Sequence, residues 1–119
     1  MDVSDGLAWD LYRMARASGL GARLVLEQVP LHADVQAASL ASGRSVLDHG
    51  LHDGEDHELI ASMDPEAWER FHSSALGGEW CAIGHLEALG GPGEHLTLQT
   101  GGADERWNPG PGRGWSYTR

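Results

Sequence analysis

The sequence of 119 residues contains one cysteine and no lysine. A single cysteine, Cys81, excludes an internal disulfide and favours a reducing, cytoplasmic environment. The basic residues number 8, all of them arginines, against 18 acidic residues, which gives a formal net charge of −10. This balance argues against a nucleic-acid surface, which needs a basic stripe. Without lysine, binding of a phosphorylated ligand would depend on carboxylate-held divalent cations, helix N-termini or arginines.

Long apolar segments are also absent. Apolar residues make up 40% of the chain, but no stretch approaches the roughly 20 apolar residues that span a bilayer. No targeting signal precedes the first predicted helix. We therefore expect a cytoplasmic protein without a membrane segment. The length suits one domain, residues 1–119, with a substantial core.

Hydrophobic periodicity and turn residues divide the chain into alternating helices and strands. The pattern predicts helices over 5–18, 32–42 and from Asp64–Pro65 to Gly77–Gly78, and strands over 22–30, 58–63, 80–89 and 95–100. Residues 45–57 are turn-rich, and the tail 101–119 has too many Gly and Pro residues for regular structure. The order of elements predicts an α+β fold, a mixed β-sheet packed with helices.

The stretch DVSDG, residues 2–6, places two carboxylates and a hydroxyl directly before the first helix. Asp2 and Asp5 are hard oxygen ligands at a spacing that suits Mg²⁺, which takes one or two protein carboxylates together with water and phosphate. The N–H groups at the start of a helix favour an anion nearby. Ordinary N-capping of the helix by Ser4 or Asp5 explains the same residues without any ligand.

A second acidic stretch, HDGEDHEL, covers residues 52–59. Its four acidic residues surround Gly54 and repel one another unless a metal, a cationic ligand or water offsets their charge. A solvated turn is therefore an alternative to a binding site. The ligand pattern of an EF-hand is missing, and the histidines lack the spacing of a zinc site.

Three further residues are expected at the core. Cys81 lies in an apolar stretch, so we expect it in the core. Trp107 and Trp115 are expected to cover the core, although an exposed aromatic after glycines can also stack on a planar cationic ring.

Five segments together resemble the C-terminal domain of thiamine-monophosphate kinase: MDVSDGLAWDL, ASGLGARLVLEQVPL, HDGEDHELIASM, CAIGHLEAL and the final Gly-Trp. This family belongs to a group of ATP-using enzymes that includes aminoimidazole ribonucleotide synthetase, selenophosphate synthetase and a hydrogenase-maturation protein. The resemblance implies the C-terminal fold of that group. It also implies an enzyme that uses ATP and Mg²⁺ to phosphorylate thiamine monophosphate to thiamine diphosphate.

The resemblance assigns roles to five residues by their positions in the motifs. It implies that Asp2 and Asp5 are Mg²⁺ ligands and that Ser4 contacts ATP. It implies that Glu55 and Trp115 contact the substrate. Catalysis in such an enzyme is mostly positioning and neutralisation of charge, so no catalytic group is assigned.

Four positions depart from the family pattern. Asp53 stands where the family has the first glycine of Gly-Gly-Glu-Asp, and His57 stands where it has tyrosine. The terminal Asp-His of the family is Ser116–Tyr117. These departures concern the geometry of the substrate site, whereas the acidic and aromatic positions are retained.

The N-terminal domain of the family has no counterpart in this chain. In the family it supplies most metal ligands, much of the nucleotide site and the dimer interface. The resemblance therefore implies that the chain works with an N-terminal kinase domain in a homodimeric enzyme and is inactive alone. Two alternatives stay open: a free-standing ligand-binding or regulatory domain of the same fold, and part of another ATP-using enzyme of that group.

Overall fold

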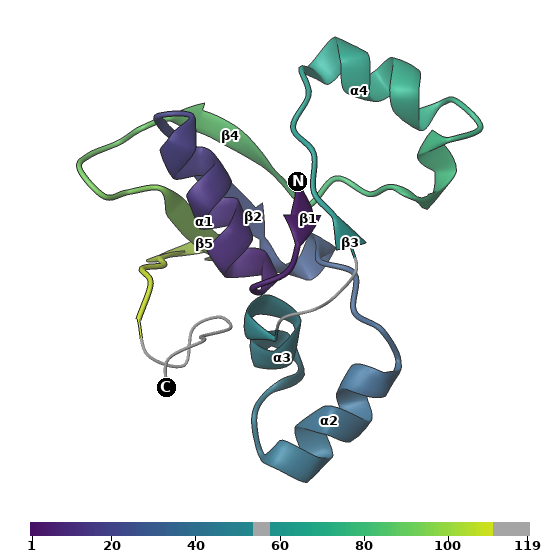
Figure 1. Cartoon of the computed structure of the whole chain (residues 1–119), viewed down its shortest axis with the longest axis vertical. Helices are drawn as coiled ribbons and strands as arrows, with labels where there is room; N and C mark the ends of the chain where they lie inside the picture. The colour runs from purple at the N-terminus through teal and green to yellow at the C-terminus, as the bar shows by residue number, and fades with distance from the viewer. Residues whose placement is uncertain (54–57, 111–119) are drawn as a thin grey trace.

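The computed structural model describes residues 1–53 and 58–110. Within these ranges the chain forms short strands, α-helices and two 3-10 helices (Figure 1). Their bounds are β1 (Asp2–Val3), α1 (Leu7–Ala17), β2 (Leu20–Val25), η1 (Leu26–Gln28), α2 (Asp34–Ser42), α3 (Val46–His52), β3 (Glu58–Leu59), α4 (Pro65–His72), η2 (Gly77–Glu79), β4 (Gly84–Ala88), β5 (Leu96–Thr100) and β6 (Ala103–Arg106).

A four-stranded sheet in the order β4-β2-β5-β6 forms the centre of the fold. β2 pairs in parallel with β5 and antiparallel with β4, and β6 pairs antiparallel with β5. Helix α1 lies against β2 and β5 (Figure 1). β1 and β3 form a separate two-stranded ladder. The predicted α+β class, with a mixed sheet packed with helices, is confirmed.

The core lies between α1 and the sheet because both present apolar residues at the period of their element. Leu7, Leu11 and Ala15 are buried along α1, about one helical turn apart. The parallel register places Leu24 of β2 beside Leu98 of β5, and both are buried. Each large apolar side chain removed from water stabilises the fold by about 1.5–3 kcal/mol. This packing fixes α1 on the sheet, and with it the DVSDG loop that leads into α1.

The opposite face of the sheet is charged. Arg23 follows the buried Ala22 on β2 and therefore points away from α1. Its guanidinium donates to the carboxylates of Asp104 at 2.6 Å and Glu87 at 3.3 Å. These hydrogen bonds, the one to Asp104 foremost, raise the pKa of Arg23 above its ordinary value. The alternation that predicted this strand thus reflects an apolar face and an ion-paired face.

Two elements form where irregular chain was predicted. Helix α3 occupies part of the turn-rich stretch 45–57, and Ser45 caps it by accepting a hydrogen bond from the Asp48 N–H at 3.0 Å. Strand β6 follows β5 through the turn Gly101–Gly102, in which both residues have positive φ. A two-residue turn of this kind matches the twist of paired strands. It joins the first part of the predicted irregular tail to the sheet.

Three predicted strands are shorter than expected. The strand predicted over 22–30 is paired only over Leu20–Val25, as β2, and Leu26–Gln28 form the 3-10 helix η1. In the segment 58–63, only Glu58–Leu59 is a strand, and both residues are exposed, although the following Ile60 is buried. The predicted strand 80–89 begins only at Gly84, as β4. Cys81 therefore lies before the paired strand and is exposed, so its prediction as a core residue was wrong.

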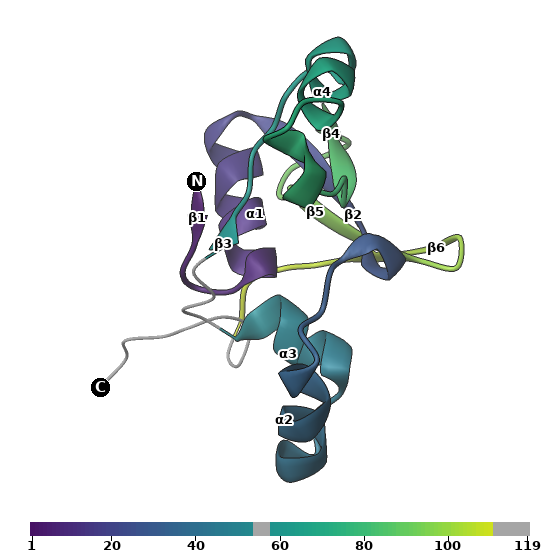
Figure 2. The same cartoon turned by 90° about the vertical axis from the view of Figure 1, so that its right-hand side faces the viewer.

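Helix α4 begins as the sequence predicts but ends at His72, before the predicted Gly77–Gly78, which belong to the 3-10 helix η2. The carboxylate of Asp64 accepts a hydrogen bond from the Ala67 N–H at 2.8 Å, and Pro65 occupies the first helical position. The helix projects away from the four-stranded sheet in both views (Figures 1 and 2). Within residues 1–53 and 58–110, no helix combines the length and the apolarity that crossing a bilayer requires.

Gly84 marks a close approach of β4 to β2 that a side chain would prevent. A Cβ atom at this position would lie 1.9 Å from the Arg23 carbonyl oxygen. We predict that Gly84→Ala lowers the free energy of unfolding by about 2–3 kcal/mol, because β4 must move away from β2. Urea unfolding of the chain measures this change.

Gly78→Ala is the matched control, because a Cβ atom there would meet nothing within 4 Å. Its free energy of unfolding should stay within about 0.5 kcal/mol of the unsubstituted chain. Equal unfolding midpoints for the two variants would contradict the close approach of β4 to β2.

Candidate functional site

The described residues on either side of 54–57 lie at the N-terminal end of α1, beside the DVSDG stretch. β1 pairs with β3, so that Asp2 lies opposite Leu59 and Val3 opposite Glu58. The amino group of Met1 donates to the Ile60 carbonyl at 3.0 Å and extends this ladder. The residues directly after the segment 54–57 are therefore held against the DVSDG stretch.

The residues directly before 54–57 lie against the same stretch. Gly6 has φ +101°, and a Cβ atom there would lie 3.0 Å from the Leu51 carbonyl oxygen and 3.1 Å from the carbonyl group of His52. Only glycine combines this conformation with this proximity at little cost. The turn at Gly6 therefore places the start of α1 against the C-terminal end of α3 (Figure 1). Residues 51–52 and 58–60, which lie on either side of 54–57, are thus both in contact with the DVSDG stretch.

A buried carboxylate on α1 holds the loop in place. Asp10 is 0% exposed, and its Oδ2 accepts hydrogen bonds from the Ser4 N–H at 2.8 Å and the Asp5 N–H at 2.9 Å. Its Oδ1 accepts a hydrogen bond from the Arg13 guanidinium at 2.5 Å. Three donors thereby offset the cost of burying the charge.

This arrangement replaces the predicted N-cap. The residue at the N-cap position is Gly6, and no side chain in the described residues caps α1. The prediction that Ser4 or Asp5 caps this helix is therefore wrong. Asp10 reaches back from the first turn and binds backbone N–H groups that precede the helix. The side chains of Ser4 and Asp5 are consequently not used as caps of α1.

The three residues predicted for metal and nucleotide binding lie on this loop. Asp2 is exposed on β1, Ser4 is partly buried, and the Asp5 side chain is 18% exposed. Asp5 forms an ion pair with Arg13 at 2.8 Å. The predicted substrate contacts, Glu55 and Trp115, lie outside the described residues.

The donor set of this loop fits Mg²⁺ only in part. Asp2 and Asp5 supply the hard oxygen ligands that Mg²⁺ prefers, and Mg²⁺ commonly takes one or two carboxylates while water and phosphate complete its shell. Among residues 1–53 and 58–110, no three acidic, histidine or cysteine side chains lie close enough to hold a metal by themselves. Further ligands would have to come from water, phosphate or other protein segments.

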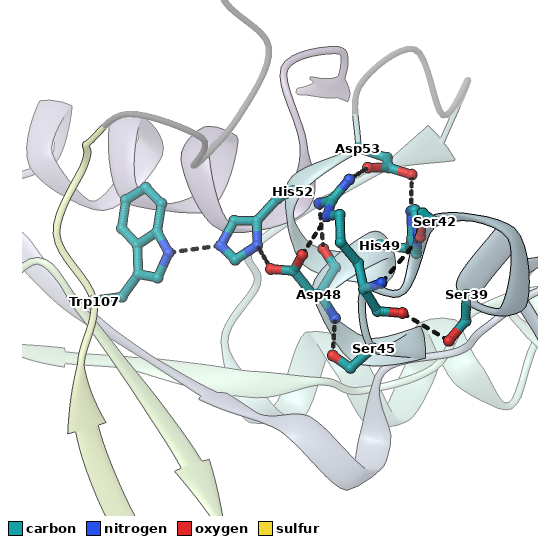
Figure 3. Close-up of polar contacts among 9 residues, drawn as sticks. Ser39, Ser42, Ser45, Asp48, His49, His52, Asp53 and Trp107 are labelled. Atoms are coloured by element: carbon teal, nitrogen blue, oxygen red, sulfur yellow. Dashed lines mark hydrogen bonds and ion pairs between the residues drawn. The ribbon is translucent and has the colours of Figure 1, made fainter.

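Helix α3 and the residues flanking it carry a connected set of charged and polar side chains (Figure 3). The Asp48 carboxylate bonds to His52 Nδ1 at 2.8 Å and to Arg44 Nε at 2.5 Å. Arg44 also donates to Asp53 Oδ1 at 3.0 Å, and the second Asp53 oxygen bonds to His49 Nδ1 at 2.6 Å. Asp53, which departs from the family pattern, is thus tied to the preceding helix.

Trp107 connects this set to the core. Its indole is 1% exposed and donates from Nε1 to His52 Nε2 at 3.0 Å. Because His52 Nε2 is an acceptor here, the proton of a neutral His52 lies on Nδ1 and points at Asp48. The prediction that Trp107 belongs to the core is confirmed. Trp107 also fixes the orientation of the last turn of α3.

The pKa of the Asp48 carboxyl is lowered by its hydrogen bonds. Burial alone would raise the pKa of its carboxyl, but the hydrogen bonds from Arg44 and His52 together hold the pKa below its ordinary range. The hydrogen bond to Asp48 likewise raises the pKa of Arg44. A folded-state pKa below the unfolded value means that ionised Asp48 stabilises the fold at neutral pH. This contribution is lost as the pH falls through the folded-state pKa.

Asp48→Asn should therefore cost stability at neutral pH more than in acid. Because the Asp48 side chain is 37% exposed, we expect a loss of no more than about 1 kcal/mol at pH 7. The loss should shrink as the pH falls below about 4, the ordinary range of an aspartic acid. Urea unfolding at pH 7 and pH 3 measures both values.

Asp34→Asn on α2 is the control, since the Asp34 side chain is 91% exposed. It should change stability little at either pH. If both variants lose the same stability at both pH values, Asp48 has no special role in holding α3.

Sequence reasoning missed Asp10 and Arg13 as site residues. Both residues stand between the apolar positions of the first helix, where charged residues normally face water. The sequence feature that points to Asp10 is its position in the first helical turn, within reach of the backbone N–H groups that precede the helix.

Comparisons with known proteins found proteins of similar sequence. A thiamine-monophosphate kinase from Rhodopirellula baltica is 47% identical over 66 residues, which are 56% of this chain and 21% of that protein. A thiamine-monophosphate kinase from Caulobacter vibrioides is 39% identical over 92 residues, which are 71% of this chain and 25% of that protein. No protein-family model matches the chain. The chain spans about a fifth to a quarter of the length of these curated relatives.

Solved structures share the fold. A structure of AaThiL complexed with AMPPCP and TMP matches with a TM-score of 0.70 at 25% identity, over 99% of this chain and 33% of that chain. A chain of a HypE-HypF complex matches with a TM-score of 0.57 at 20% identity, over 91% of this chain and 35% of that chain, and shows the fold alone. By sequence and by fold together, this chain is similar to the C-terminal domain of the thiamine-monophosphate kinases.

Proposed function

We propose that this chain serves as the C-terminal domain of a thiamine-monophosphate kinase, which transfers the γ-phosphoryl group of ATP to thiamine monophosphate. One structural observation carries the proposal: the DVSDG loop and both flanks of the second acidic stretch meet at the start of α1. The AaThiL structure, which contains AMPPCP and TMP, supports the choice of ligands.

In this proposal the loop holds the metal and the nucleotide. Asp2 and Asp5 are the Mg²⁺ ligands of this chain, and Ser4 contacts ATP. Bound Mg²⁺ would neutralise charge on the phosphates, which is the main requirement of phosphoryl transfer. Glu55 and Trp115 contact thiamine monophosphate, with the Trp115 ring stacked on the thiamine moiety.

The remaining parts of the site come from outside this chain. Two carboxylates are too few to bind the several metal ions that the reaction needs. In this proposal an N-terminal kinase domain supplies the further metal ligands. The complete enzyme is then a cytoplasmic homodimer. The chain alone is then inactive. The likeness to a HypE-HypF chain means that the fold by itself does not distinguish the kinase from other proteins. The sequence identity to thiamine-monophosphate kinases is what favours the kinase.

Asp5→Asn tests the metal-binding role in the complete two-domain enzyme. Asparagine keeps the shape of the side chain but removes its charge, so we expect thiamine diphosphate formation to fall at least about tenfold. Stability should fall by no more than about 1 kcal/mol, because the Asp5–Arg13 ion pair is partly exposed. A kinetic assay over a range of Mg²⁺ concentrations and a melting curve measure the two effects.

Asp34→Asn is the control, since Asp34 lies on α2 with an exposed side chain. Unchanged turnover in Asp5→Asn would remove Asp5 from the metal site. An unsubstituted complete enzyme that forms no thiamine diphosphate from ATP and thiamine monophosphate would refute the proposed function as a whole.

A further inference from the structure

We infer that Asp10 is the positioning residue of this site and that Arg13 is the counter-ion which a divalent cation must displace from Asp5. The inference rests on the proposed function, because it concerns the same loop. It assigns to these two residues roles that the motif resemblance does not give them.

Asp10 fixes the shape of the loop. Asp10 Oδ2 accepts hydrogen bonds from the consecutive N–H groups of Ser4 and Asp5, at 2.8 and 2.9 Å. One oxygen that binds two successive amides fixes the peptide plane between them and limits the directions that both side chains can take. Since Asp10 is 0% exposed, water does not compete for these bonds. The α1 helix, which is packed on the sheet, thereby determines where the loop side chains lie.

Arg13 neutralises charge on two carboxylates of the site. The Arg13 Nη2 atom lies 2.5 Å from Asp10 and 2.8 Å from Asp5, so one guanidinium nitrogen serves both carboxylates. Asp10 is buried and stays paired with Arg13. The Arg13 side chain is 43% exposed, which allows it to move away from Asp5. A divalent cation at Asp5 therefore competes with Arg13, whereas Asp10 favours cation binding by orienting the loop.

The two residues should thus act in opposite directions on Mg²⁺ binding. Asp10→Ala removes the acceptor of both amides, so the loop loses its fixed shape and binds Mg²⁺ more weakly. Arg13→Gln removes the competing cation and leaves both amide bonds in place, so Mg²⁺ binds more tightly. A purely structural role for the pair predicts that both substitutions weaken binding. Asp10→Asn should retain part of the wild-type behaviour, because its carbonyl oxygen can accept both amide hydrogen bonds.

The first measurement is amide hydrogen exchange of the 119-residue chain. Asp10→Ala should speed exchange at Ser4 and Asp5 at least tenfold, while the amide of Ala22, which bonds to the His95 carbonyl in the sheet, keeps its protection. The protected Ala22 shows that the variant is folded. Unchanged exchange at Ser4 and Asp5 would overturn the inference.

The second measurement is a titration of the chain with Mg²⁺ alone, followed by the NMR shifts of the amides of residues 2–5. Relative to the unsubstituted chain, the dissociation constant should rise at least threefold in Asp10→Ala and fall at least threefold in Arg13→Gln. The same direction of change in both variants, or no Mg²⁺ response at residues 2–5, overturns the inference. Neither hydrogen exchange nor the Mg²⁺ titration depends on phosphoryl transfer. A complete enzyme without kinase activity would therefore refute the proposed function, while these two measurements would still decide the roles of Asp10 and Arg13.

Discussion

The buried carboxylate of Asp10 determines how the candidate site is built. A charge removed from water is costly unless it is paired and fully hydrogen-bonded. Asp10 meets this requirement through two loop amides and the Arg13 guanidinium. The consequence is that a loop with little regular structure takes its shape from a helix in the core. Asp2, Ser4 and Asp5 are therefore presented by a rigid support, as sites that bind charged ligands require.

A second support comes from α3. Its last turn contacts Gly6 through the backbone, and its side chains are linked from Trp107 in the core to Asp53. The link passes through charge-assisted hydrogen bonds at Asp48 and Arg44, which are stronger than neutral ones. The segment that leads into the second acidic stretch is thus anchored at the core. The DVSDG loop and the residues on either side of 54–57 thus depend on the same packing of α1 against the sheet.

Periodicity was sufficient to predict the elements whose side chains alternate between core and water. The apolar face of α1 and the alternation in β2 and β5 follow directly from their sequences. Helix α3 and strand β6 were missed because their formation depends on a cap at Ser45 and on the turn at Gly101–Gly102, which are single-residue effects. The exposure of Cys81 was missed because its apolar segment does not pair along its whole length.

For a similar reason, sequence reasoning named candidate residues of the loop but not the residue that supports the loop. Asp2, Ser4 and Asp5 stand in a recognisable motif, but the burial of Asp10 depends on tertiary packing that no spacing shows.

The most direct test of the central claim is relaxation enhancement by Mn²⁺ in the presence of ATP, measured on the ¹⁵N-labelled chain. The account predicts that amides of residues 2–5 and 58–60 broaden together, because β1 and β3 bring them to one place. Amides of α4, which also carries the exposed acidic residues Glu66 and Glu69, should stay sharp. Broadening at α4 in place of residues 2–5, or broadening of residues 2–5 without 58–60, would contradict a single metal–nucleotide site at the start of α1.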